Sequence, residues 1–162
     1  MRAVAVAALA VLAQPALALS CLAPNAARTF NDLVEAPEVY VLVVGTFTAP
    51  DGLPSLPEGE GGTAQLVLTG GVVTETELTP VSTPVTVTTE CAGVWCAGFP
   101  TAGQPHLAFL ERSAAPAPPR LTVSPCPYRL LAAPTAQQMP ALHRCLTQGI
   151  CGSNEISAFE PD

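Results

Sequence analysis

The residues of this chain with the clearest chemical potential are its cysteines. There are six, at positions Cys21, Cys91, Cys96, Cys126, Cys145 and Cys151. Cysteine sulfur either binds a metal ion or pairs as a disulfide. The intervals Cys91-x4-Cys96 and Cys145-x5-Cys151 are wider than the usual spacing of zinc ligands. An even number of cysteines is typical of a disulfide framework in an exported chain. The sequence therefore predicts three disulfides, no metal site and no cofactor, and it leaves fifteen connectivities open.

The remaining titratable residues form no recognisable catalytic motif. His106 and His143 are the only histidines, and each falls on an expected strand or helix, where a structural or solvated role is the usual one. Glu75 and Glu77 are two residues apart, so on a strand they would share a face. Paired carboxylates can bind calcium or transfer protons, but on an acidic chain a solvated surface is the favoured interpretation. No nucleophile elbow, zinc-protease helix or phosphate-binding glycine loop is present. The sequence predicts a protein that is not an enzyme.

The N-terminal residues predict export. Arg2 precedes an uninterrupted apolar run over residues 3–13, which has the length of a signal-peptide core and is too short to span a bilayer. Residues 16–18 (Ala-Leu-Ala) fit the small-x-small rule for signal peptidase. We therefore expect residues 1–18 to be a signal peptide cleaved after Ala18, and the mature protein to be secreted or periplasmic.

Two alternatives at this terminus stay open. Cleavage after Ser20 would make Cys21 the first residue of the mature chain. A bacterial lipoprotein would carry a lipidated cysteine at Cys21, although Ala18 stands where such signals usually have leucine. The first alternative exposes the Cys21 amine, and the second anchors the protein to a membrane of the cell envelope.

Composition narrows the classes of partner. The formal net charge is −7 and the chain contains no lysine, so no basic patch for nucleic acid or anionic lipid is expected. No later segment approaches the roughly 18 apolar residues of a membrane helix, so we expect no transmembrane segment in the mature chain. Its length is that of one domain.

The pattern of apolar residues predicts a mostly β protein. Residues 25–35 fit a short helix with Asn25 as N-cap, ended by Pro37. Residues 39–48 are the strongest strand and are apolar on both faces, which indicates a central position. The Pro- and Gly-rich residues 50–62 predict an exposed loop. Further strands are expected at 63–69, 72–78, 83–89, 106–110 and 120–124, with a hairpin turn at Gly70-Gly71.

The C-terminal part changes to helical spacing. Thr135-x-x-Gln138 resembles a capping box, Pro140 fits the first helical position, and Gly149 fits a C-cap after a helix that ends near residue 148. We expect residues 19–152 to form one domain and residues 153–162 to form a flexible tail. Short strands joined by turns, with one helix before them and one after, predict a small antiparallel barrel or sandwich.

This order resembles the netrin-like module shared by tissue inhibitors of metalloproteinases, netrins and complement C-terminal domains. The resembling stretches are Cys21-Leu-Ala-Pro24, VYVLVVGTFTA from Val39, Thr88-Thr-Glu-Cys-Ala-Gly-Val94 with the strand ending at Leu110, and Leu121-Thr-Val-Ser-Pro-Cys126 with the helix after it. The resemblance covers roughly residues 21–148. It implies a five-stranded OB-type antiparallel barrel with a short N-terminal helix and a C-terminal helix.

The resemblance also implies a disulfide pattern. In the family, an N-terminal cysteine is bonded to the cysteine that ends the last barrel strand, which corresponds here to Cys21 and Cys126. The other pairs would then be Cys91 with Cys96 and Cys145 with Cys151, each across a short loop, which departs from the long-range bonds of the family.

Finally, the resemblance implies a binding surface and a function. The surface would consist of Cys21, Leu22, Ala23 and Pro24 beside the Cys91–Cys96 loop with Trp95, a residue expected to pack on the disulfide rather than to stand exposed. We expect a disulfide-bonded binding module whose partner is another extracellular or periplasmic protein. The alternative is a metalloprotease inhibitor, which presents an N-terminal amine and carbonyl to the catalytic zinc. The family does so from a Cys-x-Cys start, whereas this chain has Ser20-Cys21 and no second cysteine nearby.

Overall fold

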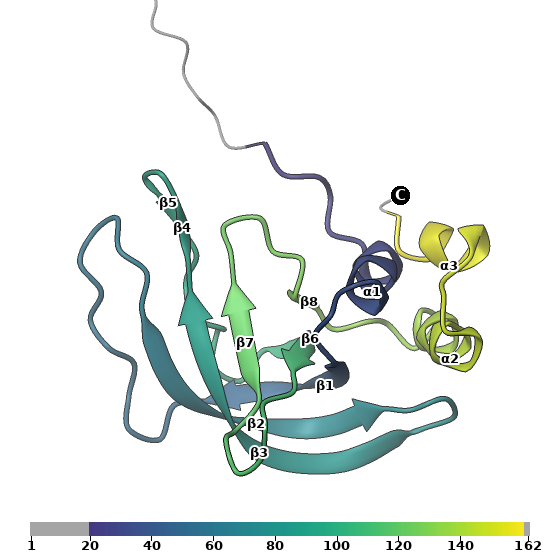
Figure 1. Ribbon diagram of the computed structural model, residues 1–162, viewed down its shortest axis with the longest axis horizontal. Helices are drawn as coiled ribbons and strands as arrows, with labels where there is room; N and C mark the ends of the chain where they lie inside the picture. The colour runs from purple at the N-terminus through teal and green to yellow at the C-terminus, as the bar shows by residue number, and fades with distance from the viewer. Residues whose placement is uncertain (1–19, 161–162) are drawn as a thin grey trace, which may run out of the picture.

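The computed structural model describes residues 20–160, so the predicted signal peptide and the cut after Ala18 lie outside the described residues. Figure 1 shows a strongly curved sheet with helices gathered on one side. The elements in chain order are α1 (Ala26–Val34), β1 (Tyr40–Thr48), β2 (Thr63–Val73), β3 (Leu78–Thr89), β4 (Cys91–Ala92), β5 (Trp95–Cys96), β6 (Pro105–Glu111), β7 (Arg120–Val123), β8 (Leu130–Ala132), α2 (Met139–Gln148) and α3 (Ser153–Ser157). The prediction of a mostly β protein with a helix before and after the strands is confirmed.

The main sheet has six strands in the order β1-β2-β3-β7-β6-β8, and β1 also pairs with β6. All of its pairings are antiparallel except β3 with β7, which is parallel. The β6–β7 connection consists of one residue pair, Glu111 with Arg120. The five-stranded barrel that the resemblance implies is not found as a closed barrel. The structure has a strongly curved six-stranded sheet, to which β8 adds an edge.

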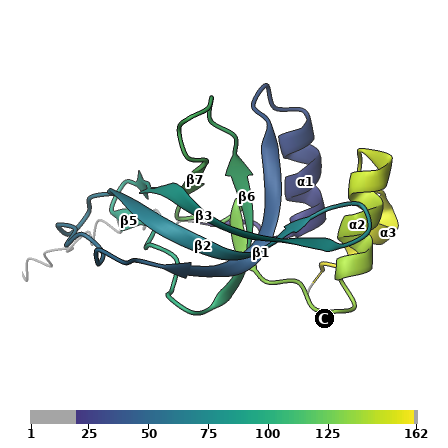
Figure 2. The same cartoon turned by 90° about the horizontal axis from the view of Figure 1, so that it is seen from below.

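Strand β1 lies between two layers of apolar side chains, as its apolar faces predicted. Val43 and Phe47 belong to the core enclosed by the curved sheet, together with Leu68 and Val85. Leu42 belongs to the second core, between the outer face of the sheet and the helices. Figure 2 shows the three helices together beside β1. Because successive side chains of a strand point to opposite faces, one continuous apolar strand supplies both cores.

The hairpin predicted at Gly70-Gly71 is wrong. Strand β2 runs through both glycines, and the turn follows at residues 74–77, where the Thr74 N–H donates to the Glu77 carbonyl. Gly70 pairs with Gly45 of β1, and a Cβ on Gly70 would lie 2.1 Å from the Val44 carbonyl oxygen. The glycine thus allows two strands to approach closely. Glu75 and Glu77 consequently lie in the turn and share no strand face.

The helices follow the predicted caps more closely. The Asn25 side chain accepts the Ala27 and Arg28 N–H groups at 3.1 Å, which fixes the start of α1. Helix α2 has proline in its first turn and ends at Gly149, whose φ of 72° is left-handed. Both predicted helix boundaries are confirmed to within a few residues.

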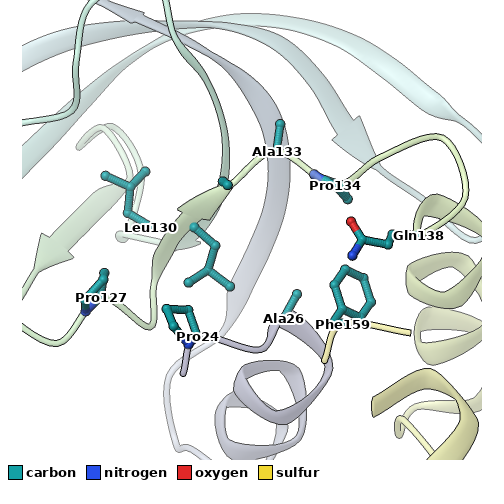
Figure 3. Close-up of a pocket in the computed structure, with 10 residues that line it drawn as sticks. Pro24, Ala26, Pro127, Leu130, Ala133, Pro134, Gln138 and Phe159 are labelled. Atoms are coloured by element: carbon teal, nitrogen blue, oxygen red, sulfur yellow. The ribbon is translucent and has the colours of Figure 1, made fainter. Parts of the chain in front are cut away.

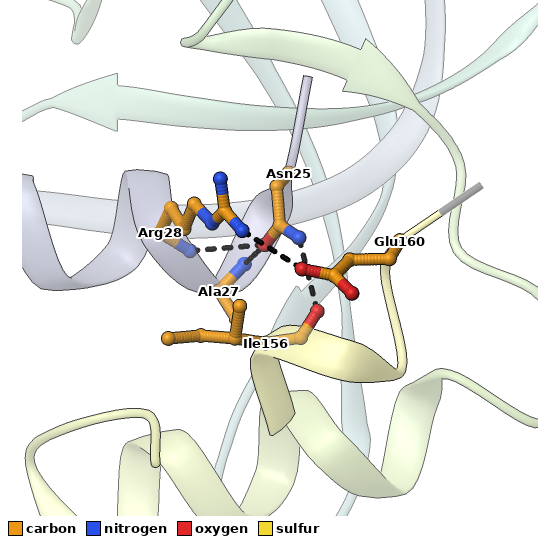
Figure 4. Close-up of polar contacts among 5 residues, drawn as sticks. All are labelled: Asn25, Ala27, Arg28, Ile156 and Glu160. Carbon is orange, nitrogen blue, oxygen red and sulfur yellow. Dashed lines mark hydrogen bonds and ion pairs between the residues drawn. The ribbon is translucent and has the colours of Figure 1, made fainter. Parts of the chain in front are cut away.

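The segment expected to form a flexible tail contains a short helix and several polar contacts. Residues 153–157 form α3, and its Glu155 carboxylate accepts a hydrogen bond from Arg144 of α2 at 2.7 Å. The Asn25 side-chain amide donates to the Ile156 carbonyl at 3.0 Å, and Arg28 pairs with Glu160 at 2.8 Å. Figure 4 shows these contacts between the start of α1 and the end of the chain. The C-terminal residues are therefore fixed by polar contacts with two other helices.

Candidate binding surface

Three disulfides link the described cysteines, and no described cysteine is free. They join Cys21 to Cys126, Cys91 to Cys96 and Cys145 to Cys151. The prediction of three disulfides is confirmed, and the three pairs agree with those expected in the sequence analysis. Only the Cys21–Cys126 pair corresponds to a bond of the family that the chain resembles. The first bond closes a long loop and ties the chain before α1 to the end of β7.

The parallel pairing of β3 and β7 places the two segments of the predicted surface at the same end of the sheet. Residues 86–89 of β3 pair with residues 120–123 of β7, so both strands end at the same end of the sheet. The Glu90 N–H donates to the Val123 carbonyl at 2.9 Å, just before the hairpin of β4 and β5 begins. Cys126 follows β7 and holds Cys21. The N-terminal segment 21–24 and the β4–β5 hairpin therefore leave the sheet at one end, above it in Figure 1.

Large apolar side chains are exposed on both segments. Leu22 is 89% exposed, Val94 is 83% exposed and Trp95 is 52% exposed. We call these three residues the apolar end. Trp95 was expected to pack on the Cys91–Cys96 disulfide, yet half of its surface is open, and Ala92 is its partner across the hairpin. Trp95 and the adjacent Val94 are thus both open to solvent, and exposed aromatic side chains are frequent at protein-binding surfaces.

The two histidines lie in separate structural settings. The His106 ring on β6 lies 6.2 Å from the Phe47 ring, and its Nε2 is buried without a hydrogen-bond partner. His143 on α2 has Nδ1 2.6 Å from the Thr74 carbonyl oxygen, so it connects that helix to the β2–β3 turn. Within residues 20–160, no group of three or more histidine, cysteine or acidic side chains could hold a metal ion. The geometry assigns neither histidine to a chemical site.

A second feature, which the sequence interpretation missed, is a pocket of about 300 Å³ beside β8. Figure 3 shows Pro127 and Leu130 at one end of the pocket, Gln138 and Phe159 at the other, and Pro24 and Ala26 along the side between them. Two of its walls come from segments whose role the sequence did not show. These are β8, to which no element was assigned, and the residues after α3, which were expected to form a flexible tail. The apolar triplet Leu130-Leu131-Ala132 was the available signal, but three residues are too few to show strand periodicity.

A cation between two aromatic rings precedes β8. The Arg129 guanidinium carbon lies 5.2 Å from the ring centres of both Tyr40 and Tyr128. Burial raises the pKa of the Tyr40 hydroxyl above its ordinary value of 10.0, and the nearby Arg129 charge partly opposes that shift. Tyr40 Oη and Arg129 Nε are both buried without a hydrogen-bond partner. The phenol is therefore neutral at physiological pH, and Arg129 supplies the local charge.

The fold and the surface define a small, mostly β, disulfide-bonded module with an exposed apolar end. None of the helices within residues 20–160 has the length and apolarity needed to cross a membrane. No family model matches the chain, and the searches of curated proteins and of solved structures found no significant match.

Proposed function

We propose that this chain is an exported, non-catalytic module of the OB type, similar to netrin-like modules, which binds another extracellular or periplasmic protein through its apolar end. An OB fold is a five-stranded, partly open barrel. The pairings that support this assignment run β1-β2-β3-β7-β6 and return to β1 through the β1–β6 contact. The weak β6–β7 connection agrees with a partly open barrel.

The observation that carries the proposal is the covalent attachment of the exposed apolar residues. Leu22 follows Cys21, which is bonded to Cys126, and Trp95 precedes Cys96, which is bonded to Cys91. Two disulfides thus restrict both segments that present apolar side chains. Such restriction lowers the conformational entropy that is lost when a partner binds. A binding site benefits from this preorganisation.

A photo-crosslinking experiment tests the proposal. Benzoyl-phenylalanine replaces Trp95 in one exported protein and Glu58, an exposed residue of the β1–β2 loop, in the matched control. We expect a discrete protein adduct from position 95 and none from position 58, in the compartment where the chain resides. Identical adduct patterns from the two positions, or no adduct from either, would contradict the proposal.

A second function, metalloprotease inhibition, is favoured by one observation. Cys21 is held by Cys126 while the next residue, Leu22, is almost fully exposed. Inhibition of the family type requires Cys21 to be the first residue. Mass spectrometry of the exported chain decides between the candidates: two or more residues ahead of Cys21 exclude the inhibitor, and an acyl mass on Cys21 identifies a lipoprotein.

A further inference from the structure

Strand β8 is the edge of the main sheet, and its free side adjoins the pocket of Figure 3. We propose that this edge binds an extended segment of a partner protein by strand addition. A neutral aliphatic side chain of that segment occupies the pocket, and an acidic side chain meets Arg129. This site goes beyond the proposed function, because it uses none of the residues of the apolar end.

The backbone groups of β8 show which side of the strand is free. The Phe109 N–H donates to the Arg129 carbonyl at 2.8 Å, and the Ala133 N–H donates to the Pro105 carbonyl at 3.4 Å. Backbone direction alternates along a strand, so Leu130 and Ala132 direct their N–H and C=O groups away from β6. Among residues 20–160, no group bonds to them on that side. Two donors and two acceptors are thus available in the spacing that an extended peptide matches.

The other open edge of the sheet, on β3, has the opposite character. The Thr86 N–H donates to the Pro119 carbonyl, away from β2, so the even-numbered residues of β3 face outward. Pro80 and Pro84 fall on these outward positions beyond the β7 pairing, and proline lacks the N–H that strand addition requires. Proline on an edge protects against pairing with another chain. Of these two edges within residues 20–160, β8 is the one that carries no proline, so its sequence leaves it open to pairing.

The pocket accounts for the side chains of an added strand. Its lining contains no ionisable residue, and Leu130, Leu131 and Ala132 of β8 form one wall. Successive side chains of an added strand point alternately to the two faces of the sheet. Every second side chain would therefore face the pocket, whose volume of about 300 Å³ accommodates an aliphatic group. In strand addition, the backbone of the peptide bonds to the sheet edge and its alternate side chains enter pockets. The β8 edge and its pocket offer both features.

The charge of Arg129 indicates that the partner segment also carries an acidic residue. The three ion pairs among residues 20–160 use Arg28, Arg120 and Arg144. Arg129, which immediately precedes β8, has no acidic partner there, and its Nε is buried without an acceptor. Arg129 is only partly buried, and a carboxylate is the strongest acceptor for a guanidinium group. A peptide carboxylate beside the edge would therefore pair with the accessible part of this side chain.

Peptide selection followed by matched edge variants tests the proposal. The probe is a phage-displayed library of random nonapeptides, selected on the exported, disulfide-bonded chain, and the enriched peptides are synthesised for fluorescence anisotropy. We expect them to combine an aliphatic residue with a nearby acidic residue. Ala132→Pro, which removes an outward N–H at a position where an edge tolerates proline, should weaken binding about tenfold. Ala132→Ser, which keeps that N–H, should bind as the parent does.

An Arg129 variant and hydrogen exchange on the unaltered chain test the two parts of the proposal separately. Arg129→Gln should weaken acidic peptides but not their Glu-to-Gln versions. In the unaltered chain, bound peptide should slow hydrogen exchange at the Leu130 and Ala132 amides, which tests the edge even if the proline variant fails to fold. The proposal is overturned if no peptide is enriched, or if exchange at those two amides stays unchanged on binding. It is also overturned if sedimentation shows a dimer that Ala132→Pro abolishes, since a second copy would then occupy the edge.

Discussion

The interior of the curved sheet and the layer between sheet and helices are stabilised in different ways. Apolar side chains from five strands fill the interior, among them Phe47, Leu66 and Leu121. The helical layer also contains apolar residues, such as Phe30 and Leu142. In addition, polar contacts join its helices. These are Asn25 with Ile156, Asn31 with Cys151, Gln138 with Ala158 and Arg144 with Glu155.

This difference has a physical cause. Strand pairing satisfies the backbone groups of the sheet and positions its side chains at the same time, so apolar packing is sufficient in the interior. Helices of five to ten residues are unstable alone. They need contacts that fix their relative positions, and the Cys145–Cys151 bond supplies one between α2 and α3. The comparison predicts that the apolar interior of the sheet controls the global free energy of unfolding. It also predicts that the polar contacts and the disulfide between the helices control local order in the helical layer.

The largest effect should come from the interior. Phe47→Ala removes a ring that is 1% exposed and should lower the free energy of unfolding by about 3–5 kcal/mol, because it leaves a cavity. Urea denaturation of the oxidised chain measures this change. Val39→Ala, at an exposed position, should alter stability by less than about 0.5 kcal/mol. Equal effects of the two substitutions would contradict the claim that the interior controls global stability.

The next effect concerns the disulfide of the helical layer. Replacing Cys145 and Cys151 by serine frees a short loop and should cost about 2 kcal/mol in the chain-entropy model. The matched control replaces Cys91 and Cys96, which close a loop of similar length in the hairpin. Hydrogen exchange should show α3 loosened by the first pair of substitutions and unaffected by the second. Loosening of α3 by both would show that the bond has no local role.

A smaller effect is expected from Asn31. Its amide donates to the Cys151 carbonyl at 2.9 Å and accepts the Cys151 N–H at 2.7 Å, so one side chain fixes the end of the α2–α3 connection to α1. Asn31→Ala should cost about 1–2 kcal/mol by thermal unfolding. Asp32→Ala on the exposed side of α1 is the control and should be nearly neutral. If the two variants melt together, this link contributes nothing to stability.

The smallest effect is a dependence on pH. The Arg144 hydrogen bond holds the pKa of the Glu155 carboxyl below its ordinary value of 4.5. Because the folded pKa is depressed, this contact contributes fully above about 4.5 and is lost as the pH falls through the folded value. Exchange of the Ile156 amide should therefore accelerate below pH 4.5 more than that of interior strands. Glu155→Gln should remove this extra acceleration, and a variant that retains it would contradict the assignment.

Local sequence patterns predicted the parts of the fold that depend on one element at a time. Asn25 and Gly149 marked helix ends because capping depends on adjacent backbone groups. The apolar residues of β1 indicated a strand covered on both faces. Gly70-Gly71 failed because a glycine pair permits both a tight turn and a close approach of two strands. The decision between the two comes from Gly45, which lies opposite Gly70 on the neighbouring strand β1.

The candidate surface was predicted in part. The sequence indicates Cys21 to Pro24 and Trp95, and the parallel β3–β7 pairing places their two segments at one end of the sheet. The exposure of Trp95 was not predicted, because exposure depends on what packs against a side chain. Strand β8 was missed because it is too short to show a strand pattern, and its pocket was missed because it depends on which segments pack together. The residues of the pocket come from segments separated by more than a hundred positions.

The sequence by itself determined the number of cysteines, the mostly β pattern, the helix caps and the absence of a catalytic motif, all of which follow from residue type and short-range spacing. The tertiary structure alone decided that two glycines lie within a strand and that residues 153–157 pack as a helix. It also decided that β8 is an open edge beside an apolar pocket. These features depend on contacts between distant segments, and the free energy of such contacts is set by the packed neighbours rather than by local residue preference.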